Sequence, residues 1–224
     1  HVFSCSRRNK GDVAVSWPRK CVEEILAEPR TIRFQTGKRR RAFIRNVVAV
    51  GLSSGFIEPL ESTSIHLIQT AVNRILDLLP SGPVSDTARA EYNRRTDFEM
   101  SRLRDFVILH YHANQREGLP FWDEVRSMAV PETLQRKLDL FRDSGFIQRD
   151  GDELFDVPGW AQVMIGQNLR PARLHPIASQ VSRDSLAKFV QSLESAYARD
   201  AARLPGHADY LSRFAPMRTN EKAA

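Results

Sequence analysis

The stretch NVVAVGLSSGFIEPLESTS, residues 46–64, holds the signals that decide the fold. Its apolar run Val47–Val50 is followed by glycine, which is typical of a buried strand. At its other end, Ser62 or Thr63 can cap a helix, because apolar residues at helical spacing follow. The sequence between these ends therefore predicts a strand-to-helix connection rich in glycine and serine.

Further elements are expected on both sides of this stretch. Upstream, Thr31–Thr36 alternates like a strand and precedes the basic turn Gly37–Arg41, so we expect two strands flanking that turn. Downstream, apolar residues recur every three or four positions up to Pro80 and predict a helix: Ile65, Ile68, Val72, Ile75, Leu76 and Leu79. Ser81–Pro83 predicts a linker.

The rest of the chain is expected to be mostly helical. Ser85 or Asp86 can open a long helix that runs to about Asn114. Three further helices are predicted, from Pro131 to Gly145, over 157–167 and over 182–204, and a short hairpin is predicted over 146–155. The predicted fold class is therefore α+β and predominantly helical.

Composition narrows the class of protein. The chain is 42% hydrophobic and 27% charged, an ordinary globular balance. No apolar run approaches the roughly eighteen residues that span a bilayer, and no signal pattern is present, so we predict a cytoplasmic protein. Cys5 and Cys21 are expected to be reduced thiols. No metal site is expected, and four histidines are interpreted as helix-face or packing residues: His66, His110, His112 and His175.

The net charge of +6 is local. Residues 1–45 carry 12 Lys or Arg and 4 acidic residues, which leaves the remainder nearly neutral. One alternative is a helical nucleic-acid-binding protein that uses this basic segment. That alternative is disfavoured because the excess charge stops at Arg45 and no aromatic residues are interleaved with it.

The start of the predicted helix suits an anion. Its first turn presents unpaired N–H groups and a partial positive charge, so the amides of Thr63 and Ser64 could hold a halide or a phosphate, with Glu61 beside them. The alternative is an ordinary helix start with two solvated acids, Glu58 and Glu61. From the residues alone, this simpler interpretation is favoured.

A resemblance changes that balance. Asn46–Leu52 followed by Phe56–Thr63 closely resembles the second flavin-side motif of the tryptophan halogenases, a family of flavin-dependent enzymes. The resemblance covers roughly residues 26–190 and continues in five shorter motifs: Leu109–His112, Pro120–Trp122, Leu140–Arg142, Trp160–Gln167 and Leu174–Pro176.

The resemblance implies a reaction and a set of residue roles. In this family, reduced flavin and oxygen convert a halide into hypohalous acid, which reaches an essential lysine beside the substrate. Glu61 then corresponds to the catalytic glutamate, and Ser62 to the neighbour that links the flavin and substrate sites. The backbone amides of Thr63 and Ser64 correspond to those that bind chloride.

The resemblance also implies cofactors and partners. Gly51 and Leu52 would lie against the ring of FAD, where a residue without bulk allows close approach. The FAD would be reduced by a separate flavin reductase, and chloride or bromide would be the halide. The substrate would be an aromatic small molecule related to indole or tryptophan. Because Trp160–Ala161 replaces the paired tyrosines of tryptophan-specific members, another indole or a larger aromatic is expected. A homodimer is also considered.

Features that the family carries are missing from these 224 residues. There is no Gly-x-Gly-x-x-Gly, no Trp-x-Trp-x-Ile-Pro and no lysine in the catalytic context. We therefore expect a C-terminal fragment that is inactive alone. The expected organisation is a disordered lead over 1–25 that matches nothing in the family, a flavin-side segment over 26–80, a helical module over 81–204 and a flexible tail over 205–224. A fragment of another FAD-dependent monooxygenase is the alternative, but it gives no reason for Glu61–Thr63.

Overall fold

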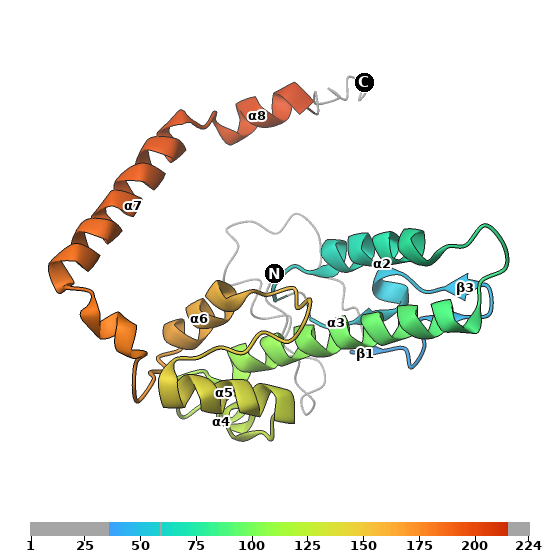
Figure 1. Ribbon diagram of the computed structural model, residues 1–224, viewed down its shortest axis with the longest axis horizontal. Helices are drawn as coiled ribbons and strands as arrows, with labels where there is room; N and C mark the ends of the chain where they lie inside the picture. The colour runs from blue at the N-terminus through green and yellow to red at the C-terminus, as the bar shows by residue number, and fades with distance from the viewer. Residues whose placement is uncertain (1–35, 59, 215–224) are drawn as a thin grey trace, which may run out of the picture. The chain divides into compact units, whose positions relative to one another are not determined.

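A computed structural model describes residues 36–58 and 60–214 (Figure 1). The predicted strand over 31–36 falls outside the described residues except for Thr36, as do the lead over 1–25 and both cysteines. The chain divides into two units, one ending at Arg173 and the other beginning at Leu174. Each unit is described by itself.

The β-structure of the first unit consists of short antiparallel pairs. Strand β1 (Gly37–Lys38) pairs with β4 (Gly55–Phe56), and β2 (Phe43–Ile44) pairs with β3 (Val47–Val48). The predicted turn over 37–41 is therefore wrong, because its first two residues form a strand. The tight turn lies instead at Arg45, which has a left-handed φ of 53° and joins β2 to β3.

The buried strand predicted before Gly51 is also shorter than expected. Only Val47 and Val48 are in strand, and Gly51–Ser53 forms the short 3-10 helix η1. At the edge of the hairpin, a side chain takes the place of another strand and satisfies the backbone hydrogen bonds of β2. The amide of Asn93 accepts a hydrogen bond from the Phe43 N–H and donates one to the Phe43 carbonyl, both at 2.9 Å.

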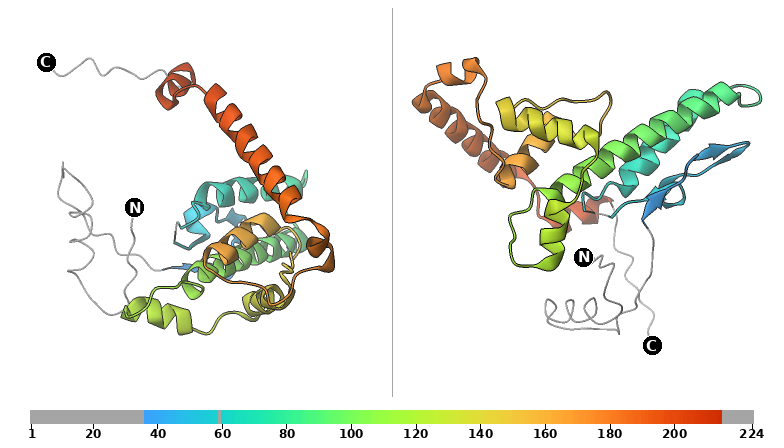
Figure 2. Two further views of the ribbon diagram at one scale, coloured as in Figure 1. Left: turned by 90° about the vertical axis from the view of Figure 1, so that its left-hand side faces the viewer. Right: turned by 90° about the horizontal axis from the view of Figure 1, so that it is seen from below.

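The predicted first and second helices are confirmed as α2 (Ser64–Leu78) and α3 (Asp86–His112). Thr63 is the residue before α2, and the Ser85 hydroxyl caps α3 by accepting from the Ala88 N–H at 3.1 Å. The two helices lie side by side in Figures 1 and 2 and are joined through Arg74. Its guanidinium donates to Thr96 and to Glu99, both at 2.9 Å.

One small core of buried residues consists of Ala42, Phe43 and Tyr92. A second, larger core surrounds the C-terminal half of α3. Helices α4 (Pro120–Ser127), α5 (Glu132–Ser144) and α6 (Val157–Gly166) follow in the chain. The predicted end of α5 at Gly145 is confirmed by its φ of 74°. The buried residues of this core come from α3, α5, α6 and the segments beside them: Phe106, Leu109, Ala113, Leu134, Leu138, Phe141, Ile147, Trp160 and Met164.

The hairpin predicted over 146–155 is wrong, since these residues contain no strand. Ion pairs hold this segment against α5. The Nζ of Lys137, which is fully buried, lies 2.9 Å from Oε1 of Glu153 and 3.5 Å from Oδ2 of Asp150. Arg136 reaches Asp150 from the same helix at 2.8 Å.

The second unit consists of η2 (Pro176–Gln180), α7 (Arg183–Arg203) and α8 (His207–Phe214). The predicted helix over 182–204 is confirmed, and the Ser182 hydroxyl caps it. Helix α8 lies in the region where a flexible tail was predicted. No helix in the described part of the chain is long and apolar enough to cross a membrane. The described structure is thus predominantly helical with few strands, as predicted.

Candidate active site

The connection from β3 to α2, residues 49–63, contains two glycines that pack against the helices. A Cβ at Gly55 would lie 2.8 Å from Cε of Met100 on α3 and 3.0 Å from the Gly37 carbonyl oxygen. Gly51 has a φ of 61°, and a Cβ there would lie 2.7 Å from Cγ1 of Ile68 on α2. Bulk at either position would therefore push the connection away from the helices.

The end of the connection is conformationally strained. Ser62 has a left-handed φ of 54°, which costs a non-glycine residue on the order of 1–3 kcal/mol. This conformation turns the chain into α2. The side chain of Thr63, the N-cap residue, makes no capping hydrogen bond to this helix, so the first-turn amides are directed at the space before the helix.

A small cavity lies at this helix start. Its volume is about 10 Å³, roughly the space of a single water-sized sphere. Its lining includes Thr63 and Ser64 together with residues of the connection and of both helices: Gly51, Leu52, Gly55, Phe56, Ile57, Leu67 and Leu103. The structure therefore brings four of the six predicted site residues around one space, and the other two, Glu61 and Ser62, directly precede Thr63 in the chain.

Glu61 is held by a histidine of α3. Its Oε1 lies 2.8 Å from Nε2 of His110, while Nδ1 of His110 lies 2.9 Å from the Phe106 carbonyl oxygen. The Glu61 side chain is 32% exposed, so it remains accessible from solvent. His110 was interpreted from sequence as a helix-face or packing residue. His110 does pack against Phe106, and the structure adds a contact that the sequence did not predict, between its ring and the candidate catalytic acid.

The next residue of α3 holds the other acid of the connection. The Tyr111 hydroxyl donates a hydrogen bond to Oε1 of Glu58. The Tyr111 ring is stacked on Trp122, with centroids 6.0 Å apart, and Phe121 meets it edge-on at 6.2 Å. These three aromatic residues, of which Phe121 is 40% exposed, form a cluster beside the connection.

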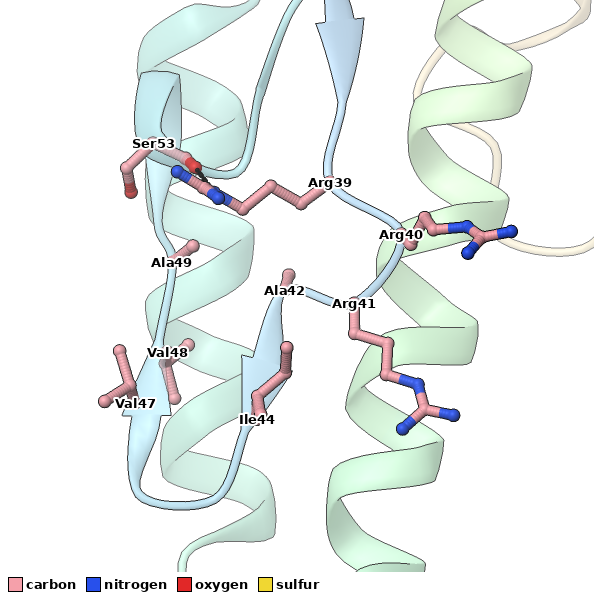
Figure 3. Close-up of a pocket in the computed structure, with 9 residues that line it drawn as sticks. All are labelled: Arg39, Arg40, Arg41, Ala42, Ile44, Val47, Val48, Ala49 and Ser53. Carbon is pink, nitrogen blue, oxygen red and sulfur yellow. Dashed lines mark hydrogen bonds between the residues drawn. The ribbon is translucent and has the colours of Figure 1, made fainter.

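The basic residues before β2 have mixed environments. Arg39 donates from Nε to the Ser53 carbonyl oxygen at 2.6 Å. Figure 3 shows Arg40 and Arg41 extending away from Ser53. All three line an open hollow of about 1100 Å³ together with apolar residues of the hairpin, including Ile44 and Val47.

Two other predicted positions can now be placed. Leu52 is 66% exposed at the surface of η1, whereas Gly51 is buried. Trp160 is buried in the second core, where its ring meets Phe106 edge-on at 4.8 Å. Among the described residues, no group of three His, Cys, Asp or Glu side chains could hold a metal ion.

Comparison with known proteins assigns the family. The sequence model of the tryptophan halogenases matches residues 1–183. The chain therefore belongs to the tryptophan halogenase family of flavin-dependent enzymes. The match begins at residue 1, so it includes the lead over 1–25 that was expected to match nothing in the family.

Individual relatives agree with this assignment. The structure of Xcc4156, a flavin-dependent halogenase from Xanthomonas campestris, is 39% identical with a TM-score of 0.85 over 93% of this chain and 43% of that one. BrvH, a flavin-dependent halogenase from Brevundimonas sp. BAL3, is 41% identical with a TM-score of 0.76 over 84% of this chain and 38% of that one. Tryptophan 6-halogenase SttH from Streptomyces toxytricini is 35% identical over 54% of this chain and 23% of its own length. The chain thus spans less than half the length of these relatives.

Proposed function

We propose that this chain forms the C-terminal part of an FAD-dependent halogenase that chlorinates or brominates an indole or tryptophan-like aromatic compound. The observation that carries the proposal is the placement of Glu61. It lies on a strained connection, directly before an uncapped helix start, and is held by His110 at 2.8 Å. An accessible carboxyl group thus lies two residues along the chain from backbone amides that suit an anion.

Each residue at the end of the connection has a separate role in the proposed reaction. The amides of Thr63 and Ser64 would hold the halide at the positive end of the α2 helix dipole. Glu61 would polarise the halogenating species and assist proton transfer near the substrate. Ser62, held in its left-handed conformation, would keep the halide site and Glu61 in fixed relation.

The chain offers a partial fit for FAD. Leu52 is 66% exposed and would offer an apolar side chain to one edge of a ring, whereas the neighbouring Gly51 is buried and packs against Ile68 of α2. When bound in its reduced form, FAD together with oxygen would supply the oxidising capacity that converts halide into hypohalous acid. A separate flavin reductase would provide the reduced cofactor.

We further propose that these 224 residues alone bind FAD weakly and do not halogenate. In the described part of the flavin-side segment, six large apolar side chains are exposed by half or more: Ile44, Val47, Leu52, Ile65, Leu76 and Leu79. The sequence contains no Gly-x-Gly-x-x-Gly to hold a pyrophosphate at a helix start. Titration of the chain with FAD, followed by flavin fluorescence, should give weak or no binding. Sub-micromolar affinity would contradict this.

The substrate proposal rests on Trp160. Its side chain has no hydroxyl, and because it is 1% exposed in the second core it presents no polar group to a substrate. Ala161 beside it has only a methyl group. We therefore favour an indole other than free tryptophan, or a larger aromatic compound.

The central test is Glu61→Gln in a full-length enzyme that contains this segment, supplied with flavin reductase, oxygen and halide. Halogenation should fall by about 10²–10⁴-fold, the usual contribution of a general acid or base, while flavin oxidation continues. Glu58→Gln is the matched control, because it lies on the same connection and its amide oxygen can still accept from Tyr111.

Two results would contradict the proposal. One is equal loss of halogenation in both variants, and the other is retained halogenation in Glu61→Gln. Circular dichroism and thermal unfolding of both variants should match the parent, so that a misfolded connection is not mistaken for lost chemistry.

A further inference from the structure

We infer that His110 is a positioning residue that orients Glu61 and keeps one proton shared between the two side chains. The catalytic consequence of this pairing rests on the proposed function. The pairing itself rests on contact distances between the described residues.

The first step concerns Nδ1 of His110. It lies 2.9 Å from the Phe106 carbonyl oxygen. A carbonyl oxygen can only accept a hydrogen bond, so Nδ1 must carry a hydrogen. The Phe106 ring meets the imidazole edge-on with centroids 5.0 Å apart, which holds the plane of the ring. The orientation of His110 is therefore set by α3 itself, one helical turn before it.

The second step concerns Nε2. It lies 2.8 Å from Oε1 of Glu61. If Nδ1 carries the only ring hydrogen, Nε2 is an acceptor, and it cannot bond to an ionised carboxylate, which is also an acceptor. Two states satisfy the contact: an imidazolium with a carboxylate, or a neutral Nδ1–H imidazole with a carboxylic acid. Both contain one proton more than neutral histidine with carboxylate.

These two states differ only in where one proton lies. Transfer from Nε2 of His110 to Oε1 of Glu61 leaves a neutral Nδ1–H ring, and that tautomer is the one that the Phe106 carbonyl already binds. Within the described part of the chain, no Lys or Arg forms an ion pair with Glu61. The nearby acid Glu58 bonds to Tyr111. His110 is thus the group that neutralises Glu61 and can return a proton to it.

The direct test is the ring ¹⁵N spectrum of His110 in the ¹⁵N-labelled chain at neutral pH, assigned by its loss in His110→Gln. The parent should show hydrogen on Nδ1. In Glu61→Gln the amide can donate to Nε2, so the ring should become a fully neutral Nδ1–H imidazole and its Nε2 signal should move accordingly. An Nε2–H tautomer in the parent, or identical ring signals in parent and Glu61→Gln, would overturn the inference.

A second arm uses the full-length enzyme. His110→Ala removes both the contact and the proton, and halogenation should fall about 100-fold, as for a misplaced reacting group, with flavin oxidation retained. His110→Gln still donates to Glu61 but cannot carry the extra proton. It should therefore recover part of the rate with a pH profile that differs from the parent. A parental rate in His110→Ala, or a parental pH profile in His110→Gln, would overturn the inference.

The two arms separate this inference from the proposed function. If Glu61→Gln abolishes halogenation but leaves the His110 ring signals unchanged, the function stands and the pairing fails. If the ring signals respond but Glu61→Gln still halogenates, the pairing stands and the proposed role of Glu61 fails.

Discussion

The hydroxyl of Tyr111 donates to Oε1 of Glu58, one residue along α3 from the histidine that contacts Glu61. Tyr111→Phe keeps the aromatic ring against Trp122 but removes this donor. We expect a loss of about 1.5–3 kcal/mol in the free energy of unfolding, the usual value for a hydrogen bond to a charged group. Urea unfolding measures it. Glu58→Gln should cost less, since its amide oxygen can accept the same bond, and an equal loss in both variants would contradict this account.

Gly51 should be intolerant of even one methyl group. Gly51→Ala places a residue in the left-handed region and brings its Cβ to 2.7 Å from Cγ1 of Ile68. Together these effects should destabilise the fold by roughly 2–4 kcal/mol, measured by urea unfolding. Gly82→Ala is the control, because a Cβ at that position would meet no atom within 4 Å.

The contact and the backbone contributions at Gly51 can be separated. Adding Ile68→Ala to Gly51→Ala removes the clashing atom but not the left-handed φ, so the cost of adding Gly51→Ala should be smaller in that background. If Gly51→Ala is as benign as Gly82→Ala, the close approach of η1 to α2 is wrong.

Lys137 should be among the most sensitive buried positions. Its side chain is fully buried, 2.9 Å from Glu153, whose carboxylate is 1% exposed. Lys137→Met leaves that charge without its cation and should cost about 3–5 kcal/mol in urea unfolding. Adding Glu153→Gln removes the stranded charge and should restore part of the stability. A double variant no more stable than the single one would contradict this reasoning.

His112 should make the fold sensitive to mild acid. Burial lowers the pKa of His112 from its ordinary 6.5, and the positive charge of Arg142 adds to the effect, while a hydrogen bond with the Val125 backbone opposes it. The pKa of His112 is lower in the folded than in the unfolded state, so as the pH falls the unfolded chain takes up the proton first. The contribution of neutral His112 to the stability of the fold is therefore fully present above pH 6.5 and declines as the pH falls below that value.

Thermal unfolding across that pH range tests this prediction. His112→Gln cannot be protonated, so its stability should fall less steeply with acid than that of the parent. Arg142→Gln should reduce the slope in part. Slopes that coincide for the parent and His112→Gln would show that other groups govern the acid response.

Helix ends were predictable because their signals are local. The Ser85 hydroxyl caps the helix that it precedes, and Gly145 takes the left-handed conformation that ends α5. Both effects act within one turn of the residue that causes them. The sequence itself therefore determines where these helices begin or end.

The β-structure and one loop were not predictable, since distant side chains determine them. The side chain of Asn93 on α3 bonds to both the N–H and the carbonyl of Phe43. Phe43 in strand β2 therefore does not need a further strand to satisfy these backbone groups. Asp150 is drawn toward Lys137 and Arg136 instead of forming a hairpin turn. Alternation and turn composition contain no information about such partners.

The candidate site was predicted only in part. The six candidate site residues, which all lie between positions 51 and 64, were recognised through a continuous motif, and four of them line one cavity. The contact of His110 with Glu61 was not predicted, because no local pattern connects the two residues. The only available signal was the place of His110 in the Leu109–His112 motif of the resemblance, which assigns no contact.

The consecutive contacts of His110 and Tyr111 also fix the length of the connection. Two adjacent residues of α3 contact two acids of the connection: His110 contacts Glu61, and Tyr111 contacts Glu58. The number of residues between the two acids is therefore matched to the spacing of their partners on the helix. An insertion or deletion of one residue between Glu58 and Glu61 would break at least one of these two contacts. Directed evolution of this segment should therefore yield functional substitutions but very few functional changes in length.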